Sequence, residues 1–140
     1  MLINSNEEII LKYDKEISRE KLVNLFKSVG WKTAEYPNRL HMAIKNSDYV
    51  VSAWCDNSLV GLISAISDGT INVFITYLLV SPEFQKKGIG KILMEDFCKS
   101  FEGFGRRILS TEIDKEKYYK KFGFNVEGIV MFNKDWKEDL

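Results

Sequence analysis

Residues 73 to 90 constrain this chain more than any other stretch, because they join a buried strand to a glycine-containing helix start. Val73 to Val80 are almost all β-branched, aromatic or aliphatic, which is typical of a strand covered on both faces. Pro82 has no amide hydrogen to donate to a neighbouring strand, so we expect the strand to end near Val80. Gly88 and Gly90 follow where a helix is expected to begin, and glycine lets backbone NH groups approach an anion without a Cβ atom in the way. The stretch therefore predicts a strand, a turn and a helix start that fits a pyrophosphate.

The spacing of these residues resembles the acyl-CoA-binding motif of the GNAT superfamily of N-acetyltransferases. That motif has a valine and a proline two residues apart, followed by Gln/Arg-x-x-Gly-x-Gly, and its positions are filled here by Val80, Pro82, Gln85, Gly88 and Gly90. The plainer interpretation is that the two glycines only make a tight connection from strand to helix. Nucleotide-binding motifs fit less well, because the lysine and Ser/Thr of a P-loop and the third glycine of a dinucleotide fingerprint are missing.

The resemblance implies a cosubstrate, acetyl-CoA, and a set of residues that hold it. It implies that the pantetheine arm pairs with the backbone of the strand end, and that backbone NH groups near Leu78 and Leu79 stabilise a tetrahedral oxyanion. No metal site is expected. The implied cofactor-binding residues are Leu78, Leu79, Val80, Gln85, Lys86, Lys87, Gly88, Ile89, Gly90 and Lys91.

Length, charge and cysteine content predict the number of domains, the kinds of partner and the cellular location. The length of 140 residues predicts one domain over 1–140. The chain has 20 basic and 20 acidic residues, so no net field attracts it to nucleic acid or to an anionic membrane, and no apolar run has the length of a membrane span. Cys55 and Cys98 lie in apolar segments without metal or redox spacing, which favours reduced, buried thiols. With no signal peptide at the start of the sequence, we expect a cytoplasmic protein.

Hydrophobic periodicity and turn residues predict the remaining elements. Ser18 is expected to cap a helix that presents Leu22, Leu25, Phe26 and Val29 on one face and ends at Gly30, and a shorter helix around Leu40, Ala43 and Ile44 closes near Asn46. Another helix follows Gly90, with Ile89, Leu93, Phe97, Phe101 and Ile92 at helical spacing, and fades by Gly103 or Gly105. The expected strands are 8–13, 49–55, 59–66, 71–80 and 107–110, with turns at 56–58 and 68–69.

Strand, helix and strand over residues 71–110 predict a right-handed crossover and a parallel pair beside an antiparallel meander. The fold class is therefore α/β (α+β): a mixed, mostly antiparallel sheet flanked by helices. The resemblance implies that the two parallel strands splay apart.

A second segment, Tyr118 to Phe124, resembles the aromatic-Tyr-x-x-aromatic-Gly-Phe segment of the same superfamily. Asp114 is expected to cap a helix over 115–122 that ends at Gly123, and 124–126 and 129–132 are expected to be the final strands. The resemblance implies that Tyr119 is the general acid that protonates the CoA sulfur. The alternative is that Tyr119 only packs beside Tyr118. The four lysines of 115–121 are either a solvated helix face or contacts to CoA phosphates.

The sequence predicts an acetyl-CoA-dependent N-acetyltransferase in which a primary amine attacks directly within a ternary complex. The alternatives are a non-catalytic acyl-CoA-binding or regulatory module on the same fold, and a nucleotide-phosphate-binding protein. The expected partner is a small-molecule or flexible amine acceptor, with no nucleic acid and no membrane, and a homodimer remains open. The acceptor is expected to enter between the first helical region and the final strands.

The resemblance makes Trp31, Tyr36 and His41 candidate neighbours of the substrate and does not identify any of them as catalytic. His41, the only histidine, is expected to be a surface or half-buried residue of the second helix. Relatives often carry an acidic residue on the central strand where Thr76 and Tyr77 stand here, so the sequence does not identify a base. An asparagine that often touches CoA in relatives is replaced around Thr111 and Glu112.

Overall fold

The computed structural model describes residues 2–4 and 7–133. The chain divides into two compact units, residues 1–110 and 111–140. The prediction of one domain over the whole length stays a prediction.

The first unit is built on a six-stranded sheet whose strands follow one another in chain order. All neighbouring strands are antiparallel except the last two, which are parallel. The strands are β1 (Leu2–Asn4), β2 (Glu7–Lys12), β3 (Tyr49–Cys55), β4 (Ser58–Ser67), β5 (Asn72–Val80) and β6 (Arg106–Ile108). The predicted mixed, mostly antiparallel sheet is confirmed, and β1 is a strand that periodicity did not predict.

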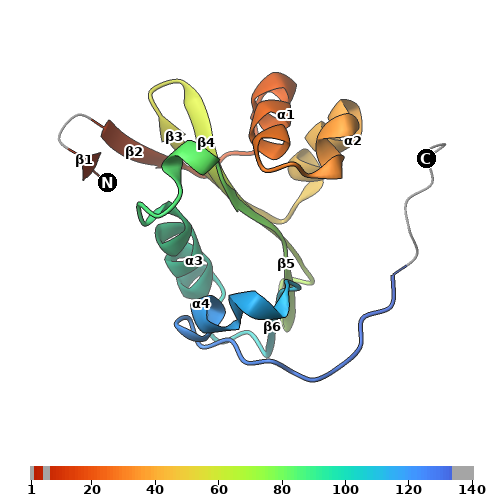
Figure 1. Ribbon diagram of the computed structural model, residues 1–140. Helices are drawn as coiled ribbons and strands as arrows, with labels where there is room; N and C mark the ends of the chain where they lie inside the picture. The colour runs from red at the N-terminus through yellow and green to blue at the C-terminus, as the bar shows by residue number, and fades with distance from the viewer. Residues whose placement is uncertain (1, 5–6, 134–140) are drawn as a thin grey trace. The chain divides into compact units, whose positions relative to one another are not determined.

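Helices cover both faces of this sheet (Figure 1). They are α1 (Arg19–Ser28), α2 (Pro37–Asn46) and α3 (Ile89–Ser100), with short 3-10 turns η1 (Lys32–Glu35) and η2 (Pro82–Phe84). The first two helices share one face, and α3 lies on the other. A Cβ atom on Gly61 of β4 would lie 3.1 Å from Ile89 and 3.4 Å from Leu93, so this glycine lets α3 pack closely on the sheet.

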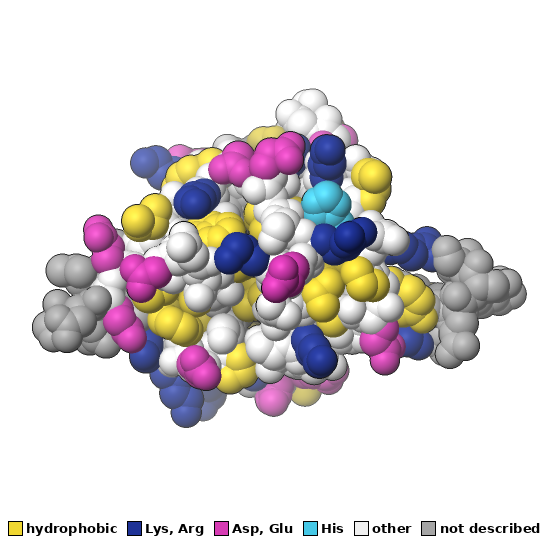
Figure 2. Space-filling view, turned by 90° about the horizontal axis from the view of Figure 1, so that it is seen from above, with side chains coloured by type: hydrophobic (Ala, Val, Ile, Leu, Met, Phe, Trp, Pro, Cys, Tyr) yellow, Lys and Arg dark blue, Asp and Glu magenta, His cyan; other side chains and the backbone are white. Residues whose placement is uncertain are grey.

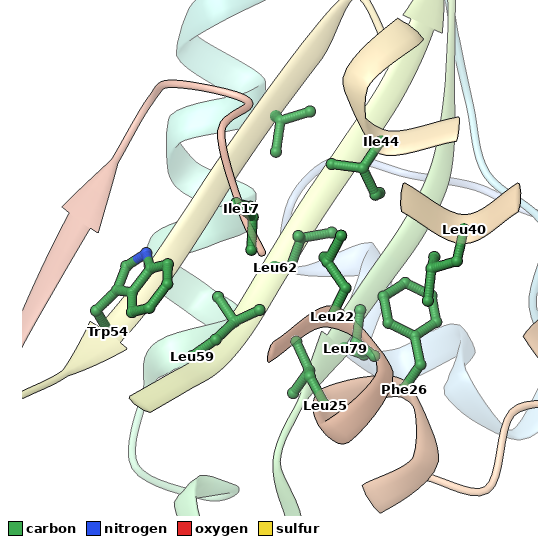
Figure 3. Packing of buried hydrophobic residues seen from close by; sticks show 11 residues of the cluster. Ile17, Leu22, Leu25, Phe26, Leu40, Ile44, Trp54, Leu59, Leu62 and Leu79 are labelled. Carbon is green, nitrogen blue, oxygen red and sulfur yellow. The ribbon is translucent and has the colours of Figure 1, made fainter. Parts of the chain in front are cut away.

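The core between α1, α2 and the sheet consists of aliphatic and aromatic side chains that are almost fully buried (Figure 3). It comprises Ile17, Leu22, Leu25, Phe26, Leu40, Ile44, Val50, Trp54, Leu59, Leu62 and Leu79. Leu79 belongs to β5, so the strand that the sequence predicts to hold the cosubstrate is anchored in this core. Because buried side chains are close-packed, the backbone of β5 is held rigidly.

The predicted ends of α1 are confirmed. Ser18 is the N-cap, and its hydroxyl accepts a hydrogen bond from the backbone NH of Lys21. Gly30 follows the helix with φ of +73°, a left-handed conformation that glycine adopts without steric cost. The connection after it was not predicted in detail, because it contains the turn η1.

The second unit holds a 3-10 turn, η3 (Ile113–Lys115), and a short helix, α4 (Glu116–Lys120). The prediction that Asp114 caps this helix was wrong: the N-cap is Lys115, and no side chain makes a capping hydrogen bond. The predicted extent was wrong as well, because the helix ends at Lys120 rather than at Phe122. Gly123 follows with φ of +90°, as a chain that leaves a helix commonly requires.

The predicted final strands, 124–126 and 129–132, were wrong, because the described residues up to 133 contain no strand after β6. The β-branched residues there do match a strand pattern, but a strand forms only when a neighbour accepts and donates its backbone hydrogen bonds. Val126, Ile129 and Val130 are exposed instead of packed.

Candidate functional site

A β-bulge lies in the middle of the β4–β5 pair. Ser64 is opposite Tyr77 and Ala65 is opposite Ile75, so Thr76 is an extra residue in β5. The hydroxyl groups of Thr76 and Ser64 share a hydrogen bond of 2.7 Å. A bulge bends its strand and increases the local twist. This bulge therefore sets the direction in which residues 77–80 of β5 point.

The parallel partner of β5 accompanies only the first part of the strand. Pairing runs from Asn72 to Phe74 on β5 and from Arg106 to Ile108 on β6, whereas β5 continues to Val80. On this side, no other strand in the described part of the chain pairs with residues 75–80. The predicted splay of the parallel pair is thus confirmed, and it leaves a row of backbone NH and CO groups for an extended ligand.

The predicted cofactor-binding residues of β5 lie at this open edge. Leu79 is buried in the core, and Leu78 and Val80 are half-buried. Their side chains therefore fix the strand. Since the same residues pair with β4, only the backbone groups that point away from β4 are on the side that a ligand can reach.

The turn after β5 is fixed by local hydrogen bonds. The backbone NH of Phe84 donates to the carbonyl oxygen of Ser81 at 2.8 Å, which closes η2. The side-chain amide of Gln85 donates to the carbonyl oxygen of Val80 at 2.9 Å. Gln85 thus ties the turn back to the end of the strand and holds the backbone between them in place.

Helix α3 begins with its first NH groups uncapped. Gly88 is the N-cap, with φ of +88°, and no side chain accepts a hydrogen bond from the first turn. The first four NH groups of a helix have no acceptor within the helix, and the helix dipole adds partial positive charge there. Lys86 also has a positive φ, of +63°. These two positive φ angles turn the chain sharply just before α3, as commonly occurs in anion-binding loops.

Three lysines, Lys86, Lys87 and Lys91, belong to the segment 85–91, which we call the cradle. Lys87 lies 3.7 Å from the carboxylate of Glu7 and 5.2 Å from the centre of the Phe84 ring. Lys91 forms an exposed ion pair of 3.7 Å with Glu95 on the same helix. Lys86 is exposed. The cradle therefore combines helix NH groups with ammonium groups, the two features that bind phosphate.

An aromatic cluster covers β5 on the side of α1. The ring centres of Phe26 and Tyr77 are 4.9 Å apart, and those of Trp31 and Tyr77 are 6.1 Å apart. Trp31 is 38% exposed and also lines a depression of about 730 Å³ between α1 and η1. The other residues lining it are Val23, Lys27, Gly30, Lys32, Ala34 and Glu35. Trp31 thus connects an open surface to the strand that carries the predicted thioester site.

The structure assigns no base on β5. The hydroxyl of Thr76 is hydrogen-bonded to Ser64, the ring of Tyr77 packs in the aromatic cluster, and β5 contains no acidic residue. His41 is half-buried on α2, as expected. Tyr36 is the N-cap residue of that helix, where its side chain makes no capping bond.

Tyr119 lies on α4 in the second unit. Its ring is half-buried and packs edge-on against Tyr118 at 5.1 Å and against Phe124 at 6.3 Å. Burial, with a smaller contribution from Tyr118, raises the pKa of the Tyr119 phenol above its usual value, so the phenol stays protonated at neutral pH. The packing beside Tyr118 is observed, and the role of Tyr119 as general acid stays a prediction.

Sequence reasoning missed two features of the site. It did not find Glu7, because an acidic residue at the start of an N-terminal strand has no pattern that relates it to residue 87. It also did not find that Thr76 is the bulged residue, since a bulge depends on pairing with β4 rather than on local composition.

In the described part of the chain, no three His, Cys, Asp or Glu side chains gather as metal ligands would. The prediction that no metal is bound stays a prediction. None of the described helices is long and apolar enough to cross a membrane. One face of the molecule shows basic and acidic side chains interspersed, with small apolar areas between them (Figure 2).

Known proteins are similar to this chain over most of its length. Residues 17–124 match the model of the acetyltransferase (GNAT) family. An uncharacterized N-acetyltransferase of Pyropia yezoensis is 30% identical over 124 residues, which cover 84% of this chain and 71% of that protein.

Solved structures with the same fold include a GNAT-family acetyltransferase of Streptococcus pneumoniae. It has a TM-score of 0.77 at 27% identity, with 91% of this chain and all of that chain covered. An aminoglycoside N-acetyltransferase solved in complex with CoA has a TM-score of 0.71 at 17% identity, with 96% and 99% covered. At that identity the second likeness is one of fold.

Proposed function

Because the chain belongs to the acetyltransferase (GNAT) family and is an N-acetyltransferase, we propose that it transfers an acetyl group from acetyl-CoA to a primary amine by direct attack in a ternary complex. The observation that carries this proposal is the junction of the open edge of β5 with the uncapped start of α3. The open edge of β5 suits an extended arm that contains amide groups, and the start of α3 suits a pyrophosphate.

Acetyl-CoA supplies the acetyl group as a thioester. The NH groups of residues 88–91 and the nearby ammonium groups would hold its phosphates, and the backbone of Leu78 to Val80 would pair with its pantetheine arm. An aminoglycoside N-acetyltransferase of the same fold has been solved with CoA, which supports this choice of cosubstrate. Gln85 would act indirectly, through its hydrogen bond to Val80.

In the proposed reaction, the amine nitrogen attacks the thioester carbon, and negative charge develops on the carbonyl oxygen. Backbone NH groups near Leu78 and Leu79 are the proposed donors to that oxygen, because preorganised dipoles stabilise such charge without reorganising. As the carbon–sulfur bond breaks, Tyr119 would give its proton to the sulfur. The proton lost by the amine passes to solvent, since β5 offers no carboxylate to accept it.

We propose a small or flexible primary amine as the acceptor. A primary ammonium group has a pKa of about 10.4 and must lose a proton before it can attack. The depression beside Trp31 is lined by the carboxylate of Glu35 and by the ammonium groups of Lys27 and Lys32, so the aromatic ring of Trp31 is the feature there that favours a cationic group. The sequence predicts that the acceptor enters between the first helical region and the final strands. Since the described residues contain no such final strands, we place the proposed acceptor at the surface between α1 and η1.

Binding of acetyl-CoA should stabilise the protein against unfolding. A ligand present at one hundred times its dissociation constant, with no affinity for the unfolded chain, adds about 2.7 kcal/mol to the free energy of unfolding. The measurement is thermal or urea unfolding with acetyl-CoA, and with ATP at the same concentration as a control. Stabilisation by ATP that equals or exceeds the effect of acetyl-CoA would instead favour a nucleotide-phosphate-binding protein.

Acetylation of amines should become faster as the pH rises from about 7 to 9, because the fraction of neutral amine rises about tenfold per pH unit below its pKa. The test is a mixed library of polyamines, amino sugars and lysine peptides, with products read by mass spectrometry and thiol release followed in parallel. Tight binding of acetyl-CoA without any acetylated amine would contradict the proposed reaction. Products on hydroxyl or thiol groups would show that the acceptor class is wrong.

A further inference from the structure

Glu7 is the one residue of β2 that the structure connects to the cradle by an ion pair. Its carboxylate oxygen Oε2 lies 3.7 Å from the ammonium nitrogen of Lys87, and both side chains are about one-third exposed, at 35% and 36%. That distance is longer than the ~2.7–2.9 Å of a direct charge-assisted hydrogen bond. The two groups therefore attract each other without a hydrogen bond between them.

The same carboxylate oxygen is poorly satisfied. Glu7 Oε2 is inaccessible to solvent, and no hydrogen-bond donor in the described part of the chain reaches it. Buried polar atoms almost always have a partner, so an exception calls for an explanation. Lys87 is thus the group that offsets the charge of Glu7. Because the two groups are 3.7 Å apart, another anion could approach the Lys87 ammonium group more closely than Glu7 does.

The charges of Glu7 and Lys87 both affect the pKa of the Cys55 thiol, at the end of β3. Burial raises the pKa of this thiol, with smaller upward contributions from Asp56 and Glu7, and Lys87 acts in the opposite direction. Glu7, Lys87 and Cys55 therefore form one electrostatic neighbourhood at the end of the sheet beside the cradle. A charge brought near Lys87 will also interact with Glu7.

We infer that Glu7 is a negative regulator of phosphate binding in the cradle: it holds Lys87 in the free protein and competes with the phosphates of CoA for that ammonium group. The inference rests on the proposed function. When a phosphate takes Lys87, the carboxylate of Glu7 loses its compensating cation and repels the phosphate across a partly desolvated space. Glu7 therefore lowers the affinity for CoA and speeds its release, a step that limits turnover in many enzymes.

The test compares Glu7→Gln with Glu95→Gln. Both changes remove one negative charge from an ion pair with a cradle lysine, and both pairs have the same N–O distance of 3.7 Å, but the Lys91–Glu95 pair is more exposed. Exposed pairs are screened by solvent and salt. In calorimetry with CoA, Glu7→Gln should bind about 3- to 10-fold more tightly than the wild type at low salt, and Glu95→Gln should differ by less than about 2-fold.

Two further measurements separate charge from structure. The apparent affinity for S-acetylpantetheine, which has no phosphate, should be unchanged in Glu7→Gln. In a Lys87→Ala background, Glu7→Gln should improve CoA binding by a smaller factor than it does in the wild type, because the competition for Lys87 is gone. Unfolding curves confirm that each variant is folded, and the amide of Gln keeps the shape of the side chain.

The outcomes distinguish this inference from the proposed function. A wild-type protein that does not bind CoA would overturn both. A wild-type protein that binds CoA while Glu7→Gln binds it equally or less tightly would overturn the inference alone, and would show instead that Glu7 serves to position Lys87. An equal gain in affinity for S-acetylpantetheine would also overturn it, because that ligand has no phosphate to repel.

Discussion

Replacing Tyr119 with Phe should lower turnover by about 100-fold or more, while the affinity for acetyl-CoA changes little. In the proposed reaction, the phenol is needed only when negative charge develops on the leaving sulfur, which happens in the transition state. Burial raises the pKa of this phenol, so it is protonated and able to donate throughout the neutral range. The measurement is single-turnover thiol release, with acetyl-CoA affinity determined separately by calorimetry.

Tyr118→Phe is the matched control for this experiment. The two tyrosines are adjacent on α4, their ring centres are 5.1 Å apart, and burial raises the pKa of both phenols. The control removes the phenolic hydroxyl of the other tyrosine in this packed pair and should leave turnover within about 3-fold of the wild type. Equal rates for both variants in a step limited by chemistry would assign Tyr119 to packing, and so would a loss that appears only in CoA binding.

The elements that local patterns specify were predicted well. The strand over 49–55 has the predicted ends, the end of β5 lies at Val80, and α3 buries Ile89, Leu93 and Phe97 as its periodicity requires. Each of these depends on residues near one another in the sequence, such as a proline that stops a strand or apolar residues at helical spacing. The start of α3 belongs to the same class, because a left-handed glycine and an uncapped helix start are local features, whereas phosphate binding there stays a prediction.

The features that were missed depend on contacts between distant residues. The apolar residues 129–132 match a strand, yet strand formation needs a partner, and the described residues provide none. The bulge at Thr76 exists only in relation to β4, and the Glu7–Lys87 ion pair joins residues 80 positions apart. Sequence patterns carry little information about such pairings, so the conformation of residues 124–133 and the electrostatics of the cradle had to come from the structure.

Replacing Gly90 with Val should weaken CoA binding by about 100-fold or more, while the free energy of unfolding of the ligand-free protein changes little. Gly90 lies in the first turn of α3, where its backbone is helical, a conformation that residues with side chains adopt without strain. The branched side chain would occupy space that phosphate oxygens need, and each lost hydrogen bond to a charged group costs about 1.5–3 kcal/mol, so losing two is enough for this effect. Calorimetry with CoA and urea unfolding measure the two quantities, and Gly90→Ala should give an intermediate loss of affinity.

Gly88 needs a different control, because its φ of +88° makes any side chain strained whether or not a ligand binds there. Gly69, in the loop before β5, has φ of +78° and nothing within 4 Å of a built Cβ atom, so Gly69→Ala measures that conformational cost alone. Both alanine variants should lose about 1–2 kcal/mol of the free energy of unfolding. Only Gly88→Ala should also bind CoA more weakly, measured where each variant is fully folded. Unchanged affinity in Gly88→Ala and in Gly90→Val would remove the cradle from the CoA site, and the glycines would then serve only to connect β5 to α3.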